Sequence, residues 1–344
     1  MANLVVSNVC DMNCAFCFAR DHLGSSHTDS GSRFISLDVF EEHLDFIERS
    51  GINEIRLIGG EPTLHPRFSE LIRAARKRDR HIVVFTHGLL SESALACLET
   101  LPVEQCTVLV NVNASRSPRS DYGSREQDER LKGLRRLGPR ALLGFNIFQT
   151  NFQLDFLLPL IQEAGCRKTI RLGLAHPVLY SRNVYLHPKQ YPIVGNKIAR
   201  FAQVAADVGV RLEFDCGFVR CMFSDGDLET LHRANAGVGW RCNPILDVDL
   251  SGRVFHCFPL AGKVQTQFSQ GAVADELRTQ LLERTRQYRM AGIYKECSTC
   301  LFKQRGECTG GCLANTIKRF RPAALHLKVP EHSMHPLALS ESPN

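Results

Sequence analysis

Short apolar runs alternate with longer amphipathic segments through the first half of the chain. The apolar runs have the length and composition of buried strands, and they lie at 4–7, 54–58, 82–86, 107–112, 142–147 and 169–174. The segments between them repeat apolar residues at helical spacing, at 36–50, 66–78, 91–98, 127–137 and 154–165. Alternation of this kind predicts an α/β fold with a parallel sheet and right-handed crossovers.

The pattern changes after Val210. The stretch 211–315 is rich in cysteine, with Cys216, Cys221, Cys242, Cys257, Cys297, Cys300, Cys308 and Cys312. Within it, residues 242–257 alternate apolar and polar side chains around a turn at 250–252, which predicts a β-hairpin whose ends bring two thiols together. Scattered Pro, Ser and His without a period predict a flexible tail at 322–344. We therefore divide the chain at 1–210, 211–321 and 322–344.

Composition narrows the class of protein. The 344 residues allow a large domain with a smaller appendage, and the net charge of +6 is spread over helical polar faces. We see no nucleic-acid-binding motif, no membrane-spanning run and no signal peptide. Because 14 cysteines occur without a secretory signal, we expect a cytoplasmic protein whose clustered cysteines bind metal and do not form disulfides.

Cys10, Cys14 and Cys17 form a Cys-x3-Cys-x2-Cys run close to the first residue. Three thiolates can hold three irons of a four-iron cluster and leave the fourth iron open, whereas electron-transfer clusters have four protein ligands. An open metal position is where a small molecule binds and reacts. Two alternatives remain: the thiols can pack as the apolar face of a helix, or they can bind zinc with a distant fourth ligand.

A second motif follows the second predicted strand. Gly59, Gly60, Glu61 and Pro62 come directly after the apolar run EIRLI. Glycine lets the backbone approach a ligand closely. A carbonyl or carboxylate at this position can accept hydrogen bonds from an ammonium group.

The cysteine run, Phe16 before its third cysteine, and LIGGEPTLHP at 57–66 together resemble the radical S-adenosylmethionine (SAM) superfamily. The resemblance implies a partial (β/α)6 TIM-like barrel over 1–210. It also implies a catalytic [4Fe–4S] cluster on Cys10, Cys14 and Cys17 that binds SAM. One electron, from a flavodoxin- or ferredoxin-type donor, would cleave SAM to a 5′-deoxyadenosyl radical that takes a hydrogen atom from substrate. Such an enzyme is oxygen-sensitive.

The resemblance also implies which residues contact SAM, because active sites of such barrels lie at the carboxyl ends of the strands. Gly59, Gly60 and Glu61 would position the methionine end. Carboxylate or ribose contacts would come from Asn111, Asn113 and Asn146. Further contacts with the nucleoside are expected from Phe16, Thr86 and Leu174. The alternative for each asparagine is a structural hydrogen bond.

The cysteine-rich region resembles the SPASM extension of radical SAM enzymes, which holds auxiliary iron–sulfur clusters. The resemblance rests on Cys-x9-Gly-x4-Cys at 242–257, Cys-x2-Cys at 297–300 and Cys-x3-Cys at 308–312. The family's last cysteine is absent here. By analogy, Cys242, Cys257 and Cys312 would hold one cluster with Cys216 or Cys221. Cys297, Cys300 and Cys308 would hold a second cluster, and the sequence does not identify its fourth ligand.

Other interpretations of the cysteines remain. The C-terminal region can hold one cluster only, or a zinc knuckle at 297–312. Cys97, Cys106 and Cys166 are expected in the core, the alternative being a hydrogen-atom donor that quenches a substrate radical.

By resemblance, we expect the enzyme to modify a ribosomally made peptide by crosslinking, thioether formation or epimerisation. The sequence before Cys10 leaves no room for a leader-binding domain, so a separate recognition protein or a short recognition element is expected. A rival function is oxidation of a small molecule such as a sugar alcohol or aminocyclitol. Less expected is a non-catalytic iron–sulfur or zinc scaffold.

Overall fold

The parallel α/β sheet predicted from the sequence is confirmed. The computed structural model describes residues 1–20, 32–113, 122–269 and 271–320, so the predicted tail lies outside the described residues. Seven strands run parallel in sequence order: β1 (Asn3–Ser7), β2 (Glu54–Gly59), β3 (His81–Thr86), β4 (Cys106–Asn111), β5 (Ala141–Ile147), β6 (Thr169–Leu174) and β7 (Arg211–Phe214). The strands form an open arc, because β1 pairs on its other side with a strand of the C-terminal region.

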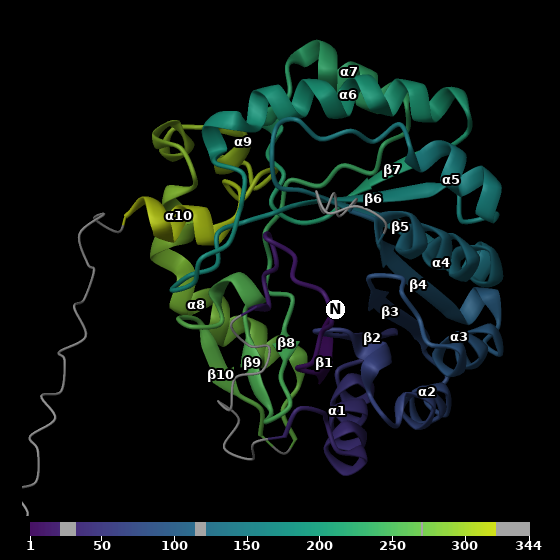
Figure 1. Ribbon diagram of the computed structural model, residues 1–344. Coiled ribbons are helices and arrows are strands. Elements are labelled where there is room, and N and C mark those ends of the chain that lie inside the picture. The colour runs from purple at the N-terminus through teal and green to yellow at the C-terminus, as the bar shows by residue number, and fades with distance from the viewer. Residues whose placement is uncertain (21–31, 114–121, 270, 321–344) are drawn as a thin grey trace, which may run out of the picture.

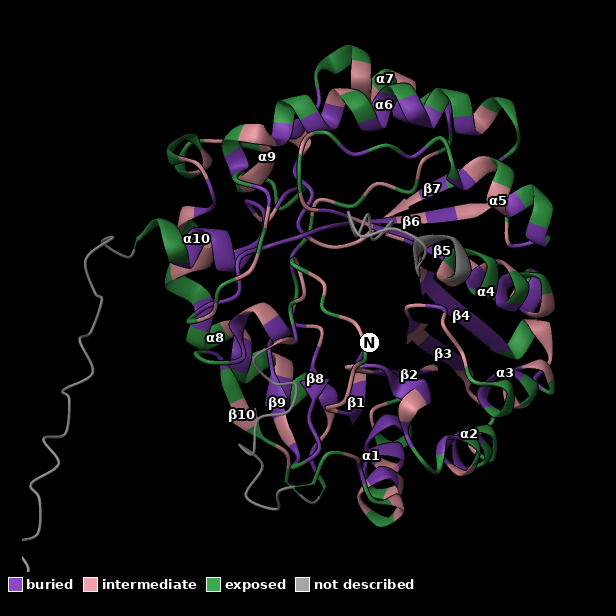
Figure 2. Ribbon diagram, viewed as in Figure 1, coloured by how far each residue is buried: buried purple, intermediate pink, exposed green. Residues whose placement is uncertain are grey.

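Helices line the outside of the arc (Figure 1). They are α1 (Leu37–Arg49), α2 (Phe68–Arg76), α3 (Glu92–Glu99), α4 (Tyr122–Leu137), α5 (Leu157–Ala164), α6 (Tyr191–Asp207) and α7 (Asp225–Arg233). Figure 2 shows their buried faces turned toward the strands and their exposed faces turned outward, as their amphipathic sequences require. The start of α1 is fixed by Ser36, whose hydroxyl accepts a hydrogen bond from Val39 N at 3.3 Å.

The predicted hairpin is also confirmed, and it extends the main sheet. β8 (Asp247–Val248) pairs antiparallel with β9 (Arg253–Phe255), and β10 (Gln265–Gln267) follows on β9. Asp249 holds the turn, since its carboxylate accepts hydrogen bonds from Ser251 N at 2.9 Å and Arg253 N at 3.0 Å. β8 runs parallel to β1. The cysteine-rich region is therefore joined to the barrel by backbone pairing.

The remaining C-terminal helices, α8 (Ala274–Ala291), α9 (Leu301–Gln304) and α10 (Leu313–Arg319), lie between the hairpin and α6 (Figure 1). Two long-range hydrogen bonds hold them there. Asn315 Nδ2 donates to the Tyr191 hydroxyl on α6 at 3.3 Å, and the Tyr294 hydroxyl donates to Pro188 O at 2.7 Å. The C-terminal region thus covers the open side of the arc.

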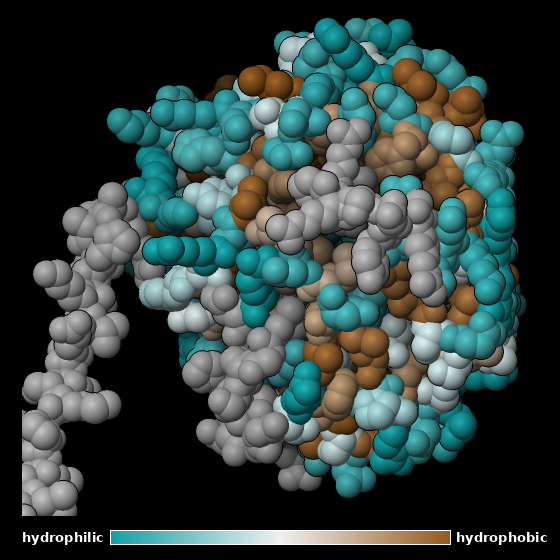
Figure 3. Space-filling model, in the orientation of Figure 1, coloured by the Kyte–Doolittle hydropathy of each residue, from teal (hydrophilic) through white to brown (hydrophobic). Residues whose placement is uncertain are grey.

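One face of the molecule gathers apolar residues toward its middle and hydrophilic residues at its rim (Figure 3). Large apolar side chains that stay exposed in the structure include Phe18 and Tyr180. In the described part of the chain, no helix has the length and apolar character needed to cross a bilayer.

Candidate functional site

The loop that carries the three N-terminal cysteines lies directly on the Gly-Gly-Glu-Pro segment. Gly60 N donates to Ser7 O and Glu61 N donates to Val9 O, both at 2.7 Å. The contact requires glycine at position 59, where φ is +153° and a Cβ atom would lie 2.2 Å from Ser7 O. The two motifs that the sequence singled out are therefore brought together by backbone hydrogen bonds at the carboxyl ends of β1 and β2.

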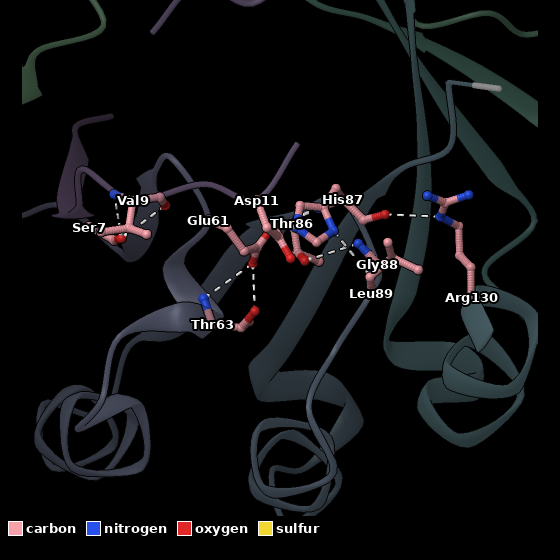
Figure 4. A network of polar contacts seen from close by, with 10 residues as sticks. All are labelled: Ser7, Val9, Asp11, Glu61, Thr63, Thr86, His87, Gly88, Leu89 and Arg130. Atoms are coloured by element: carbon pink, nitrogen blue, oxygen red, sulfur yellow. Dashed lines mark hydrogen bonds and ion pairs between the residues drawn. The ribbon is translucent and has the colours of Figure 1, made fainter. Parts of the chain in front are cut away.

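The carboxylate of Glu61 is committed to the fold of this site. The residue is 1% exposed. Its Oε1 accepts hydrogen bonds from Thr63 N at 3.2 Å and Thr63 Oγ1 at 2.7 Å, while its Oε2 accepts from His87 N at 3.0 Å (Figure 4). The side chain thereby ties the turn after β2 to the end of β3. The backbone of the glycine segment remains to bind a ligand.

His87 follows β3 and links this segment to the cysteine loop. Leu89 N donates to His87 Nδ1 at 3.1 Å, so the ring proton belongs on Nε2, which lies 2.8 Å from Asp11 Oδ1 (Figure 4). Ligand atoms of Cys10, Asp11 and His87 lie within 4.8 Å of one another. Because Nε2 carries the proton in this network, His87 orients Asp11 and does not offer a lone pair to a metal.

The three N-terminal thiols are near one another. Burial is the main cause that raises the pKa of Cys14, and the neighbouring Cys17 thiol adds to the shift. Burial also raises the pKa of Cys10, to about 11, with smaller contributions from Glu61, Asp11 and Cys17. Cys17 N donates to Cys14 O at 3.1 Å, which closes a turn between the last two cysteines. The set of donors fits an iron–sulfur cluster, since three thiols on one short loop can each lose a proton and bind an iron.

Arg130, on α4, is a site residue that the sequence analysis missed. It is 8% exposed, and its Nε donates to His87 O at 2.9 Å (Figure 4). Burial lowers the pKa of Arg130, and the Cys14 thiolate is among the charges that oppose this effect. A guanidinium with its Nε already bonded keeps its terminal nitrogens for an anion.

The three predicted asparagines form a ladder across the ends of β4 and β5. Asn113 Nδ2 donates to Asn146 O at 2.7 Å, and Asn146 N donates to Asn113 Oδ1 at 2.9 Å. Asn146 Nδ2 in turn donates to Asn111 Oδ1 at 3.2 Å. Glycines make room for two of these side chains, because a Cβ at Gly144 would lie 2.9 Å from Asn111 Oδ1 and one at Gly173 would lie 2.6 Å from Asn146 Oδ1.

The remaining predicted contacts lie at the same ends of the strands. Phe16 stacks on Phe148, which follows β5, with ring centroids 4.7 Å apart. The Thr86 hydroxyl accepts a hydrogen bond from Gly88 N at 3.1 Å, and Leu174 ends β6. The loop after β6 then joins two parts of the molecule, since Val184 N donates to Ala15 O and Leu179 N donates to Pro259 O, both at 2.9 Å.

The C-terminal cysteines separate into two groups. Cys216, Cys257 and Cys312 form one group with Cys242, and burial is the main reason that their pKa values are raised, to about 12 for Cys242. The backbone N–H of Leu313 opposes the shift of Cys242. Cys221 lies instead with the other group, which comprises Cys297, Cys300 and Cys308.

Two of the three thiols that the sequence places in the core are buried. Cys106 and Cys166 lie within the hydrophobic core, where burial raises their pKa values to about 12 and about 11. Cys97 packs against the same core from α3.

A cavity of about 1090 Å³ lies largely toward the amino ends of the strands, and its lining also includes Cys216, just after β7. Its lining includes Glu54, His81 and Thr107, at or near the amino ends of their strands. We do not assign the reaction to this cavity, since the cysteine loop and the glycine segment meet at the carboxyl ends.

Comparisons with known proteins agree with this geometry. Residues 4–148 match the family model described as the Radical SAM superfamily. The fold is similar to that of Streptococcus suis SuiB bound to S-adenosylmethionine, with a TM-score of 0.67 and 16% identity over 92% of this chain and 74% of SuiB. It is also similar to anSMEcpe with bound AdoMet and Kp18Cys peptide, with a TM-score of 0.60 and 18% identity over 90% of this chain and 89% of that protein.

A further solved structure is SuiB bound to the precursor peptide SuiA, with a TM-score of 0.65 and 16% identity over 92% of this chain and 72% of SuiB. At these identities the structural likeness concerns the fold, and the family assignment comes from the matched segment with its cysteine run. Residues 4–148 therefore form a radical SAM domain, and enzymes that contain this domain use a [4Fe–4S] cluster and SAM.

Proposed function

We propose that the enzyme cleaves SAM reductively on a cluster held by Cys10, Cys14 and Cys17, and that it takes a hydrogen atom from a ribosomally made peptide. One observation carries the proposal. The loop at 9–17 is seated on the glycine segment by the hydrogen bonds of Gly60 N and Glu61 N, so the three thiols lie where active sites of such barrels are found. When bound, the cluster supplies the electron that breaks the sulfonium.

The chain's own residues then have separate tasks. Because the Glu61 carboxylate is fully used within the loop, the backbone carbonyls of the glycine segment are the acceptors for the methionine ammonium. The asparagine ladder keeps the ends of β4 and β5 in register. The remaining hydrogen-bonding groups of its side-chain amides would bind the ribose. Phe16, stacked on Phe148, gives the adenine an apolar neighbour.

Arg130 is the residue we assign to the methionine carboxylate, and its replacement tests that role. We expect Arg130→Ala to raise the KM for SAM about tenfold or more, because a charge-assisted hydrogen bond contributes about 1.5–3 kcal/mol. Iron content should stay unchanged. Arg135→Ala is the matched control, since Arg135 lies on the same helix and pairs with Glu163 at the surface. An unchanged KM in Arg130→Ala would contradict the assignment.

A peptide substrate is supported by the solved structures of similar fold, two of which contain a peptide. The direct test uses anaerobically purified enzyme, dithionite, SAM and synthetic peptides encoded by short reading frames beside its gene. We expect one of these peptides to change mass in a SAM-dependent reaction and to stimulate 5′-deoxyadenosine formation. Stimulation by a polyol or aminocyclitol, with every peptide unchanged, would favour the small-molecule reaction and reject this one.

The partners follow from the same proposal. A flavodoxin- or ferredoxin-type protein would deliver the electron, and a separate protein would recognise the leader of the peptide. We place the enzyme in the cytoplasm, because its cysteines and an oxygen-sensitive cluster require a reducing compartment.

A further inference from the structure

Cys221 occupies a position that the sequence could not assign. It lies in the short 3-10 helix η6 (Arg220–Met222), whose backbone is packed tightly against α6. A Cβ at Gly195 of α6 would lie 2.1 Å from Met222 O, so only glycine permits this approach. The buried Met222 side chain fixes one side of η6. Cys221, in contrast, is exposed.

Two contacts hold η6 beside the C-terminal cysteines. The Arg220 guanidinium lies 4.1 Å from the ring centroid of Phe302, in the helix that begins directly after Cys300. On the other side, Val219 packs at Gly311, where an added Cβ would be 3.0 Å from Val219 Cγ1. Residues 219 and 220 therefore contact both ends of the segment between Cys300 and Cys312.

Two of the other three thiols of this group, those of Cys297 and Cys308, lie against glycine residues. Gly310 N donates to Cys308 Sγ at 3.3 Å. Gly292 leaves room for Cys297, because a Cβ there would lie 2.8 Å from Cys297 Sγ. Hydrogen bonds from backbone N–H groups to sulfur are a usual feature of iron–sulfur sites.

The electrostatic neighbours of the thiols agree with this packing. The thiol of Cys221 has the thiols of Cys297 and Cys308 as neighbours. Cys216 is close to Cys242 and Cys312 instead. Although Cys216 and Cys221 are near in sequence, they therefore face different groups.

We propose that Cys221 is the fourth ligand of a second auxiliary four-iron cluster, together with Cys297, Cys300 and Cys308. Cys221, from a segment that precedes the hairpin, thus takes the place of the cysteine that this chain lacks after Cys312. The proposal deepens the proposed function, on which its biological meaning rests. With four thiolates bound, no iron of this cluster keeps a position for substrate, so the cluster is of the electron-transfer type.

The test uses the full chain with Cys10, Cys14 and Cys17 replaced by alanine, so that only auxiliary clusters contribute. After anaerobic reconstitution, iron, sulfide and zinc are measured, and EPR spectra are recorded before and after reduction with dithionite. This protein should hold about eight irons. Adding Cys221→Ala should remove about four irons, or remove one iron and produce the signal of an oxidised three-iron cluster.

Three further variants guard the interpretation. Cys221→Ser should keep the fold and alter the spectrum of the same cluster, because oxygen replaces sulfur as a ligand. Cys216→Ala should change the signal of the other cluster, and Cys97→Ala, outside both groups, should change neither. About eight irons with an unchanged spectrum in Cys221→Ala would overturn the proposal. So would about four irons, or zinc in place of iron, when Cys221 is intact.

These measurements do not depend on SAM cleavage. If the enzyme with its three N-terminal cysteines forms no 5′-deoxyadenosine, the proposed function fails while the cluster assignment can still hold. If the enzyme forms 5′-deoxyadenosine but Cys221→Ala leaves the auxiliary clusters unchanged, only the cluster assignment fails.

Discussion

Replacing Cys10, Cys14 and Cys17 by alanine should remove about four irons from the reconstituted enzyme and abolish 5′-deoxyadenosine formation. The three thiols belong to one loop that follows the carboxyl end of β1, whereas the described C-terminal cysteines have one another as neighbours. Without them, the cluster whose open iron would bind SAM has no protein ligands. Catalysis should therefore be lost completely and not merely slowed.

The loop itself should survive these substitutions. It is held by hydrogen bonds of Ser7 O and Val9 O, which involve backbone atoms only. The variant should therefore unfold at nearly the same temperature as the metal-free parent. Iron and sulfide analysis with a dithionite assay checks the prediction, and Cys166→Ala, a core thiol, serves as the control. Full iron content or residual 5′-deoxyadenosine in the triple variant would show that the cluster is held elsewhere.

The strands could be predicted because each one is a short apolar run that its own residues reveal. Each of the six predicted runs lies within about a residue of an observed strand, since continuous apolar stretches are typical of parallel strands covered on both sides. β7 was missed. Its sequence, RLEF, is short and alternating, and its pairing with β6 becomes visible only in three dimensions. The helix before it, α6, was not predicted either.

The site divides in the same way. The cysteine run and the glycine segment are contiguous motifs, so the sequence alone identified them. Arg130 reaches His87 O across 43 positions of the chain, and nothing in its local sequence distinguishes it from the surface arginines of α4. Likewise, the distribution of Cys216 and Cys221 between two groups depends on how η6 packs against α6. The spacing of the cysteines along the sequence shows how many thiols there are, but it does not show which of them lie together.

Gly59→Ala should unfold more easily than the parent by about 3 kcal/mol or more and should lose SAM cleavage. The reason is geometric. The φ angle of +153° is one that residues other than glycine rarely adopt. The new methyl group would lie 2.2 Å from Ser7 O and 3.0 Å from Ser7 N. These are backbone atoms of β1, so no side-chain rotation relieves the contact.

Relief must come from separating β1 from β2, and that movement breaks the hydrogen bond from Gly60 N to Ser7 O on which the cysteine loop rests. Stability and catalysis should therefore fall together. Gly239→Ala is the matched control, because a Cβ there has open space and the change should stay within about 0.5 kcal/mol. Denaturant unfolding of both variants, beside a 5′-deoxyadenosine assay, separates the outcomes. If Gly59→Ala matched the parent in both measurements, the close approach of β1 to the glycine segment could not be what positions the thiols.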